Sequence, residues 1–241
     1  MVVGIIPARL ASTRFPKKIL ANLNGKPMVV HVVEQAMRVK SIDKVILAVD
    51  HEETKNVLSK YNIDIEMTSK NHNSGTDRVA EVAKRCLDAD VIINIQGDEP
   101  LLDPIMVDEF VKIFEDITVN MATVVSRKIN RDDFLNPNVV KAFLDQDQNA
   151  KDFKRNIDGA EINSVFRHIG IYGFRRKTLF QFTSLPQSKR EKEQSLEQLR
   201  ALDNNIYIKA LITDYDKIAV DTFSDLEKVS SEMKLSSTEI V

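Results

Sequence analysis

The chain has 241 residues, of which 43% are hydrophobic and 29% are charged, as is ordinary for a soluble globular protein. Its length can bury a sizeable core, either in one large α/β domain or in two small ones. The formal net charge of −2 gives no reason to expect nucleic acid or an anionic membrane as a bulk electrostatic partner.

Neither a targeting signal nor a disulfide is predicted. The N-terminus lacks the basic start and long apolar region of a signal peptide, and no apolar run approaches the roughly 20 residues that span a bilayer. The single cysteine, Cys86, cannot form an intramolecular disulfide, and we expect its thiol to be buried and inert. These features predict a cytoplasmic protein without membrane insertion.

The first half of the chain alternates between strand and helix patterns. A buried strand is expected over residues 2–6, ending at Pro7, and a turn at Asn24 and Gly25 precedes a helix that opens at Pro27. Further strands are expected over 44–49, near 63–67 and over 91–95, with helices over about 52–60, 79–87 and 105–116. This alternation predicts a mostly parallel, doubly wound sheet with helices on both faces.

The pattern changes in the second half. Strands are expected over 121–125, 139–144, 165–174 and 206–211, with a helix around 189–203 and a charged C-terminal helix from about Ser224. Residues 145–164 are polar and indicate an excursion or a long loop. Because no clean linker separates two domains, we expect a single domain over residues 1–241.

A short acidic loop follows the strand predicted at 91–95. Residues 94–100 read Asn-Ile-Gln-Gly-Asp-Glu-Pro, so a tight turn delivers Asp98 and Glu99 to the carboxyl end of a buried strand. In open α/β sheets ligands bind at that edge. Two adjacent acids there can hold a divalent cation such as Mg²⁺, with waters and substrate phosphates completing the shell. The alternative interpretation is a solvated turn.

A basic loop follows the first strand. Residues 8–18 carry four cations and two hydroxyls but no acid, namely Arg9, Arg14, Lys17, Lys18, Ser12 and Thr13. The loop has neither a Walker pattern nor Gly-x-Gly-x-x-Gly, so side chains rather than backbone amides would hold a polyphosphate. A solvated basic loop is the alternative, but the acidic loop at the same edge favours a metal–triphosphate site. The cations would neutralise the leaving pyrophosphate while Asp98 held Mg²⁺.

Several longer motifs occur in the order seen in one family of enzymes. They are Ile5-Ile-Pro-Ala-Arg-Leu-Ala-Ser-Thr-Arg-Phe-Pro, Asn24-Gly-Lys-Pro-Met, Ser74-Gly-Thr-Asp-Arg, Asn94-Ile-Gln-Gly-Asp-Glu-Pro, Arg167-His-Ile-Gly-Ile-Tyr-Gly and Leu196-Glu-Gln-Leu-Arg. On these motifs the chain, from Val2 to about Lys228, closely resembles the 3-deoxy-manno-octulosonate cytidylyltransferase (CMP-Kdo synthetase) family.

The resemblance implies a fold and a reaction. The fold is Rossmann-like α/β of the nucleotide-diphospho-sugar transferase type, a mixed, mostly parallel sheet with helices on both faces and a smaller β-rich dimerisation excursion. It implies a nucleotide-binding half over about 1–125, a sugar-binding and dimerisation half over about 126–215, and a segment 216–241 with the second metal aspartate and a C-terminal helix. Such enzymes are typically homodimers that use CTP and Mg²⁺ to make CMP-Kdo and pyrophosphate for lipopolysaccharide. The sugar's anomeric hydroxyl attacks the α-phosphorus of CTP in line, without an enzyme nucleophile.

The family's site residues carry over onto matching positions. The resemblance implies catalytic roles for Arg9, Lys18 and Asp98, and metal binding by Asp98 and Asp221. Nucleotide-binding positions are Pro7, Ala8, Arg9, Ser12, Arg14, Lys18, Ser74 and Gly75. Substrate-binding positions are Arg14, Arg78, Gln96, Arg155, His168, Tyr172, Glu197 and Gln198. An arginine suits a sugar carboxylate, while amides, His and Glu suit hydroxyls. Taken singly, His168 would be a structural histidine, Arg78 a solvated side chain, and Glu197 and Gln198 surface positions of an amphipathic helix.

The chain departs from the family pattern in one stretch above all. Phe153-Lys-Arg-Asn-Ile-Asp-Gly stands where the family has Phe-Ser-Arg-x-x-Ile-Pro, so Lys154 replaces Ser and Asp158-Gly159 replaces Ile-Pro. Smaller departures are Lys17 for Gly, Ala219 for Gly and Phe223 for Pro. We hypothesise that the acceptor differs from Kdo in its distal substituents, as in an 8-amino analogue or a related ulosonic acid. Lys154 would disfavour a cationic sugar if it pointed inward, so the hypothesis does not say whether the acceptor is more or less cationic than Kdo.

Two competing functions follow from the same motifs. A CMP-sialate synthetase shares the Ile-Pro-Ala-Arg opening, but its first loop normally reads Gly-Gly-Ser-Lys-x-Ile-Pro, which Leu10-Ala-Ser-Thr-Arg-Phe-Pro does not match. The altered stretch 153–159 allows a non-catalytic sugar-nucleotide binding protein. Retention of Asp98, Asp221 and the loop cations argues against that alternative.

Overall fold

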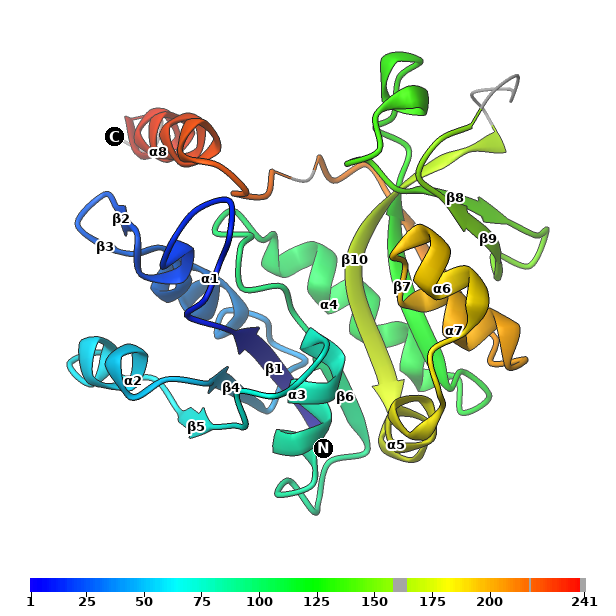
Figure 1. Cartoon of the computed structure of the whole chain (residues 1–241), viewed down its shortest axis with the longest axis horizontal. Coiled ribbons are helices and arrows are strands. Elements are labelled where there is room, and N and C mark those ends of the chain that lie inside the picture. The colour runs from blue at the N-terminus through cyan, green and yellow to red at the C-terminus, as the bar shows by residue number, and fades with distance from the viewer. Residues whose placement is uncertain (158–163, 217, 239–241) are drawn as a thin grey trace. The chain divides into compact units, whose positions relative to one another are not determined.

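The structure, a computed structural model, describes residues 1–157, 164–216 and 218–238 (Figure 1). The chain divides into two compact units. Unit 1 comprises residues 1–89, 94–105 and 217–241, and unit 2 comprises residues 90–93 and 106–216. The single-domain organisation, with divisions near residues 125 and 215, stays a prediction.

Unit 1 is built on three parallel strands. β1 (Val2–Ala8) pairs with β4 (Lys44–Val49), and β4 pairs with β5 (Ile65–Met67). The helices of this unit are α1 (Met28–Ala36), α2 (Glu52–Leu58), α3 (Gly75–Ala83) and α8 (Phe223–Thr238). β1 continues through Pro7 to Ala8, two residues beyond the expected last strand residue Ile6, because proline lacks only the amide donor and its φ is compatible with extended backbone.

Apolar runs explain these elements. Ile5 and Ile6 of β1 are both fully buried, as are Val79 and Val82 on the inner face of α3. Strands that are buried on both faces read as continuous apolar runs, whereas helices show a stripe at 3.6-residue spacing. A short hairpin, β2 (Asn22–Leu23) and β3 (Lys26–Pro27), turns at Asn24 (φ 49°) and Gly25 (φ 89°), as the Asn-Gly pair predicts.

Unit 2 is richer in antiparallel pairs. β10 (Phe166–Arg175) pairs antiparallel with β7 (Met121–Ser126) and with β8 (Lys141–Leu144), and β8 pairs antiparallel with β9 (Ala150–Lys154). β11 (Lys209–Thr213) lies parallel to β7. The remaining helices are α5 (Arg176–Ser184), α6 (Lys189–Gln194) and α7 (Gln198–Asp203). The chain passes between the units at β6 (Val91–Asn94) and near the start of α4 (Pro104–Lys112).

The structure differs from the expected elements at several points. β9 occupies part of the stretch 145–164 that the sequence indicates to be an excursion or long loop, because Ala150 and Phe153 are buried while Lys151 and Lys154 are exposed. α5 was not expected, and the helix predicted over 189–203 breaks into α6 and α7 at Ser195, whose φ is 52°. Cys86 is half-buried rather than buried.

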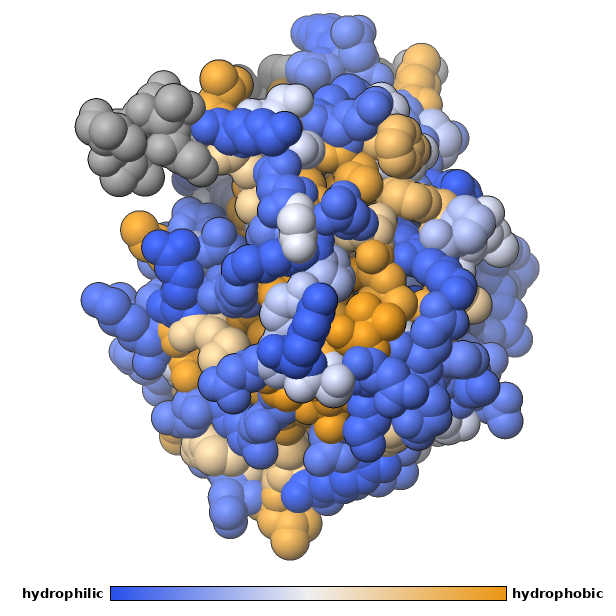
Figure 2. Space-filling model, turned by 90° about the vertical axis from the view of Figure 1, so that its left-hand side faces the viewer, coloured by the Kyte–Doolittle hydropathy of each residue, from blue (hydrophilic) through white to orange (hydrophobic). Residues whose placement is uncertain are grey.

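The described helices and the surface agree with the composition. None of the helices formed by the described residues is long and apolar enough to cross a membrane. Figure 2 shows one face, on which hydrophilic residues surround smaller apolar areas.

α6 and α7 are joined by a buried ion pair. Glu191 accepts hydrogen bonds from Nε and Nη2 of Arg200 at 2.8 and 2.5 Å, and both side chains are 5% exposed. Glu191 also completes a capping box with Ser188. Burial by itself raises the pKa of Glu191, but the hydrogen bonds and charge of Arg200, with further bonds from Gln187 and Ser188, hold that pKa below its ordinary value.

We expect Glu191→Gln to lower the free energy of unfolding by about 3–5 kcal/mol, because it leaves the buried Arg200 charge without its partner. Urea denaturation at pH 7 measures this difference. Since the folded-state pKa of Glu191 is depressed, the stabilisation is present above the ordinary pKa of 4.5 and is lost as pH falls through the folded-state pKa. Equal stability of the two proteins at pH 7 would contradict this assignment.

Candidate active site

A cavity of about 360 Å³ lies within unit 1, where the loops after β1 and β6 meet the first turn of α3 and Asp221. Ala8, the last residue of β1, lies opposite Val49, the last residue of β4. The amide of Ile95 donates to the carbonyl of Ile5 at 3.1 Å, which sets the loop that follows β6 beside the end of β1. The cavity therefore lies at the carboxyl edge of the strands, as predicted.

Close backbone packing allows the acidic loop to reach this edge. A Cβ atom built on Gly97 would lie 3.1 Å from the carbonyl oxygen of Pro7. Only glycine lets the chain pass this close to β1 without displacing backbone. Gly97 thereby sets the position of Asp98, its neighbour.

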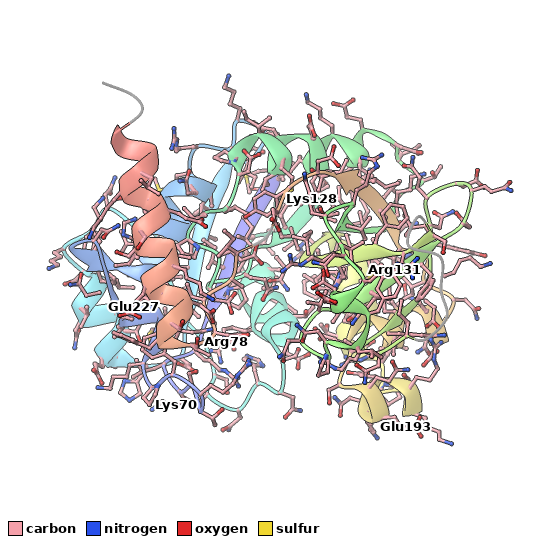
Figure 3. The ribbon with its side chains drawn as sticks, turned by 90° about the horizontal axis from the view of Figure 1, so that it is seen from above. Lys70, Arg78, Lys128, Arg131, Glu193 and Glu227 are labelled. Atoms are coloured by element: carbon pink, nitrogen blue, oxygen red, sulfur yellow. The ribbon has the colours of Figure 1, made fainter. Side chains whose placement is uncertain are left out.

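Asp50 anchors the start of the basic loop. Its carboxylate accepts from the amide of Leu10 at 2.9 Å and from Nη2 of Arg78 at 3.1 Å. The Arg78 side chain is 5% exposed, and it also donates to Thr68 Oγ1 and to the carbonyl of Ser69. Figure 3 shows Arg78 inside the outline of unit 1 and Lys70 at its edge. Asp50 was missed in the sequence, although its position directly after a predicted strand is the signal that could have found it.

Lys18 stands between two carboxylates at the centre of the site. Its ammonium nitrogen lies 2.8 Å from Oδ2 of Asp98 and 3.2 Å from Oδ1 of Asp221, and Arg14 Nη2 lies 3.1 Å from the same Asp221 oxygen. The Lys18 side chain is only 13% exposed. Three segments distant in sequence thus converge on one cationic nitrogen.

The C-terminal segment is held against the acidic loop. The amide of Val220 donates to the carbonyl of Asp98 at 2.9 Å, which sets Asp221 next to Asp98. Val220, Leu226 and Val229 pack in one core cluster with Leu23 and Met28. Asp225 accepts from the amides of Asp221 and Thr222, at 3.2 and 2.9 Å, and so fixes the turn that precedes α8.

Lys17 explains one departure from the family pattern. Its φ is 53°, in the left-handed region that glycine adopts without strain. Its ammonium group lies 2.5 Å from Oε1 of Glu53 on α2, so the residue that replaces glycine ties the basic loop to a neighbouring helix. Lys17 leads directly into a 3-10 helix, Lys18–Leu20, which carries Lys18.

The structure brings together most of the residues predicted in unit 1. Those lining the cavity are Pro7, Ala8, Arg9, Ser12, Arg14, Lys18, Ser74, Gly75, Arg78, Gln96, Asp98 and Asp221. Ser74 also caps α3, because its Oγ accepts from the amide of Asp77 at 3.1 Å. Their individual roles stay predictions.

The other predicted residues form a neighbourhood in unit 2. His168 packs between the rings of Phe153 and Tyr172, at centroid distances of 5.0 and 5.5 Å. Its Nε2 lies 2.9 Å from Thr123 Oγ1, which donates its one hydrogen to the carbonyl of Ile171, so Nε2 is the donor in this pair. Burial and the charge of Glu197 raise the pKa of the Tyr172 phenol well above its ordinary value, so this hydroxyl stays protonated.

Gln198 and Arg155 differ in their hydrogen bonding. Gln198 is 3% exposed, and its Nε2 has no hydrogen-bond partner among the residues that the structure describes. Arg155 instead donates from its guanidinium to three backbone carbonyls. Lys154 lies 3.6 Å from Asp152 and over the ring of Phe143, and Asp158-Gly159 falls outside the described residues.

The carboxylates fit a divalent cation with few protein ligands. Asp98 and Asp221 already approach one positive nitrogen from different segments. The described part of the chain contains no group of three or more His, Cys, Asp or Glu side chains that could hold a metal. Magnesium suits such a pair, since it is usually bound by one or two carboxylates plus phosphates and water.

Comparison with known proteins agrees with this geometry. The family model described as Cytidylyltransferase matches residues 3–212. The chain is 42% identical over 249 residues to the 3-deoxy-manno-octulosonate cytidylyltransferase of Geotalea daltonii, covering 97% of this chain and 98% of the relative. It is 44% identical over 237 residues to the enzyme of the same name from Chloroherpeton thalassium, covering 95% and 96% of the two chains.

Solved structures confirm the predicted fold class. A structure of CMP:2-keto-3-deoxy-manno-octonic acid synthetase complexed with CTP superposes with a TM-score of 0.91 at 34% identity, covering 98% of this chain and 99% of that one. The 4-diphosphocytidyl-2C-methyl-D-erythritol synthase of Anaerococcus prevotii has a TM-score of 0.66 at 13% identity, covering 97% and 98% of the chains. The second likeness concerns the fold alone. The mixed, mostly parallel sheet with helices is thus confirmed.

We expect Lys18→Met to lower the thermal unfolding midpoint in EDTA by about 2–4 °C, or about 1 kcal/mol, because Asp98 and Asp221 lose their shared counter-charge. Added Mg²⁺ should recover more stability in this variant than in the unsubstituted protein, since the metal meets no competing ammonium. Lys17→Met is the matched control, because Lys17 belongs to the same loop but pairs with Glu53. Equal Mg²⁺ effects in all three proteins would contradict metal binding by the two aspartates.

Proposed function

We propose that this chain, which belongs to the 3-deoxy-manno-octulosonate cytidylyltransferase family of nucleotidyltransferases, transfers CMP from CTP to the anomeric hydroxyl of 3-deoxy-D-manno-octulosonate (Kdo) or a close analogue, releasing pyrophosphate. The observation that carries the proposal is the convergence of Lys18, Asp98 and Asp221 at a cavity also lined by Arg9 and Arg14. Such a set of cations and carboxylates suits a metal-bound triphosphate.

The bond changes define what the residues must do. The anomeric oxygen bonds to the α-phosphorus, the bond from that phosphorus to the bridging oxygen breaks, and pyrophosphate leaves with the electron pair. The hydroxyl proton passes to solvent or to a base. Bound Mg²⁺ would supply electrostatic stabilisation of the phosphates, held by Asp98 and Asp221.

The cations of the basic loop act on the leaving group. Arg9 and Arg14 would hold the β- and γ-phosphates through guanidinium forks, and Lys18 would turn from the carboxylates to a phosphate oxygen. The loop is positioned for this by Asp50, which anchors Leu10, and by the Lys17–Glu53 pair. Positioning and charge stabilisation account for the rate, without a covalent enzyme intermediate.

The unit 2 residues would recognise the ulosonic acid. His168, Glu197 and Gln198 offer donors and acceptors for hydroxyls, and the phenol of Tyr172 is a protonated donor. Gln198 is the clearest candidate, because its buried amide nitrogen has no partner among the described residues, and a buried unsatisfied donor is costly unless a ligand satisfies it.

We expect purified protein to release pyrophosphate with CTP, Mg²⁺ and Kdo, and Asp98→Asn to lose about 10²- to 10³-fold in kcat, as when one electrostatic stabiliser is removed. Asp64→Asn is the control, because Asp64 is an exposed acid that pairs with Lys44 on the surface of the same unit. A pyrophosphate-coupled assay measures both.

A panel of ulosonic acids in the same assay tests the acceptor. Turnover of an 8-amino analogue in preference to Kdo would assign the altered 153–159 stretch to specificity, and clear preference for Kdo would remove that hypothesis. CTP binding without release from any sugar would favour a non-catalytic nucleotide-binding protein instead.

We also propose that the protein acts in the cytoplasm as a homodimer, within lipopolysaccharide biosynthesis. The antiparallel pair of β8 and β9 supports this proposal, because the family resemblance implies a β-rich excursion that would serve dimerisation. Sedimentation equilibrium at micromolar concentration should therefore give about twice the chain mass of 27.4 kDa. A monomer across the concentrations used in the activity assay would contradict the dimer.

A further inference from the structure

Each nitrogen of the Arg155 guanidinium donates to a backbone carbonyl within unit 2. Its Nε donates to Gln194 at 2.7 Å, Nη1 to Pro137 at 2.8 Å and Nη2 to Ser195 at 2.9 Å. All three nitrogens are thus engaged by three different acceptors. This is the geometry of a structural fork rather than of a group held ready for a ligand.

The main chain of Arg155 is itself fixed by a buried lysine. The Lys141 side chain on β8 has no exposed surface, and its ammonium group donates to the carbonyls of Arg155, Asn136 and Val139 at 2.5, 2.8 and 2.7 Å. Three donors therefore meet three acceptors. Burial lowers the pKa of Lys141, opposed by the charge of Asp133. Lys141 and Arg155 together lock the end of β9 to the loop 136–139.

The segment that Arg155 holds is a helix end that needs an anchor. α6 ends at Gln194, and Ser195 adopts a φ of 52°, which costs a non-glycine residue conformational energy. Carbonyls at a helix C-terminus have no partner within the helix, and Arg155 satisfies two of them. In Figure 3, the neighbouring Glu193 marks the outer side of α6.

Glu197 and Gln198 follow this turn directly. Only Leu196 separates Ser195 from Glu197, so the orientation of the start of α7 depends on how the turn is held. The amides of Ser195 and Leu196 both donate to the carbonyl of Glu191, at 3.3 Å for Leu196, and their exchange with solvent reports opening of the turn. The buried Glu191–Arg200 pair joins the two helices independently of Arg155.

We propose that Arg155 is a positioning residue, whose guanidinium, backed by Lys141, fixes the Gln194–Ser195 turn and so orients Glu197 and Gln198 toward the sugar acid. The proposal rests on the proposed function for the identity of the ligand. It replaces a direct contact between Arg155 and the sugar with an indirect role, and it explains why the arginine persists in a stretch where its neighbours have changed.

Hydrogen exchange of the substrate-free protein tests the anchoring itself. Arg155→Ala should accelerate exchange at Ser195 and Leu196 at least about tenfold, the factor expected for loss of about 1.4 kcal/mol of local stability. Arg155→Lys should also accelerate exchange, because a single ammonium nitrogen cannot occupy the three separate positions from which Nε, Nη1 and Nη2 of Arg155 each reach a different carbonyl. Lys151→Ala, an exposed cation on the same strand, should leave exchange unchanged. The Glu191–Arg200 pair keeps the helices joined, so the variants should still fold.

Kinetics distinguish the indirect role from a direct contact. Both Arg155 variants should raise KM for the sugar about tenfold or more while leaving KM for CTP unchanged. An unchanged exchange rate with a raised sugar KM would overturn the proposal and make Arg155 a sugar ligand. Faster exchange with an unchanged sugar KM would overturn it as well, since the turn would then not serve the sugar.

Failure of the proposed function would be detected by a different measurement. It would appear as no pyrophosphate release by the unsubstituted protein with any ulosonic acid. The exchange measurement needs neither sugar nor turnover, so unchanged exchange in Arg155→Ala would overturn the anchoring role in that case too.

Discussion

The balance of charge around Lys18 is the constraint on which the candidate site depends. Its ammonium group meets Asp98, 80 positions away in sequence, and Asp221, 203 positions away. Two ionised carboxylates in a partly buried site repel each other, and a cation between them offsets that repulsion. In the substrate-free protein Lys18 supplies that positive charge, and in the proposed reaction Mg²⁺ held by Asp98 and Asp221 would supply it. The same geometry thus serves the stability of unit 1 and the chemistry proposed for it.

The rest of unit 1 keeps those three groups in place. Asp50 binds the amide of Leu10 and the guanidinium of Arg78, so the basic loop leaves β1 in a defined direction. Gly97 lets the acidic loop pass close to Pro7. On the other side, the bond from Val220 to Asp98 brings in Asp221, and apolar packing of α8 holds it there. Arg78, expected to contact substrate, also donates hydrogen bonds to Thr68 Oγ1 and to the carbonyl of Ser69 while lining the cavity.

In unit 2, many backbone carbonyls lie in loops and short helices, where regular secondary structure does not supply their hydrogen bonds. Lys141 and Arg155 supply six hydrogen bonds to carbonyls between them. Buried polar groups are costly without partners, so cationic side chains replace the ladders that longer elements would provide. Aromatic rings complete the region, since Tyr172 contacts His168 on one side and Phe174 on the other. The residues proposed to bind the sugar are therefore in direct contact with the core of this unit.

The sequence alone determined the fold class, the positions of most strands along the chain and the two charged loops whose residues line the cavity. Apolar runs, the Asn24-Gly25 turn and the charge pattern of residues 8–18 are local signals, and each acts through neighbouring residues. The sequence did not predict β9, because its alternation of buried and exposed residues is weak. It did not predict α5 either, because the apolar face of that helix is recognisable only once its packing partners are known. The pairing of Asp50 with Arg78, and the carbonyls that Arg155 holds, were decided by tertiary structure. Side-chain partners distant in sequence depend on how strands align, and no local pattern encodes that alignment.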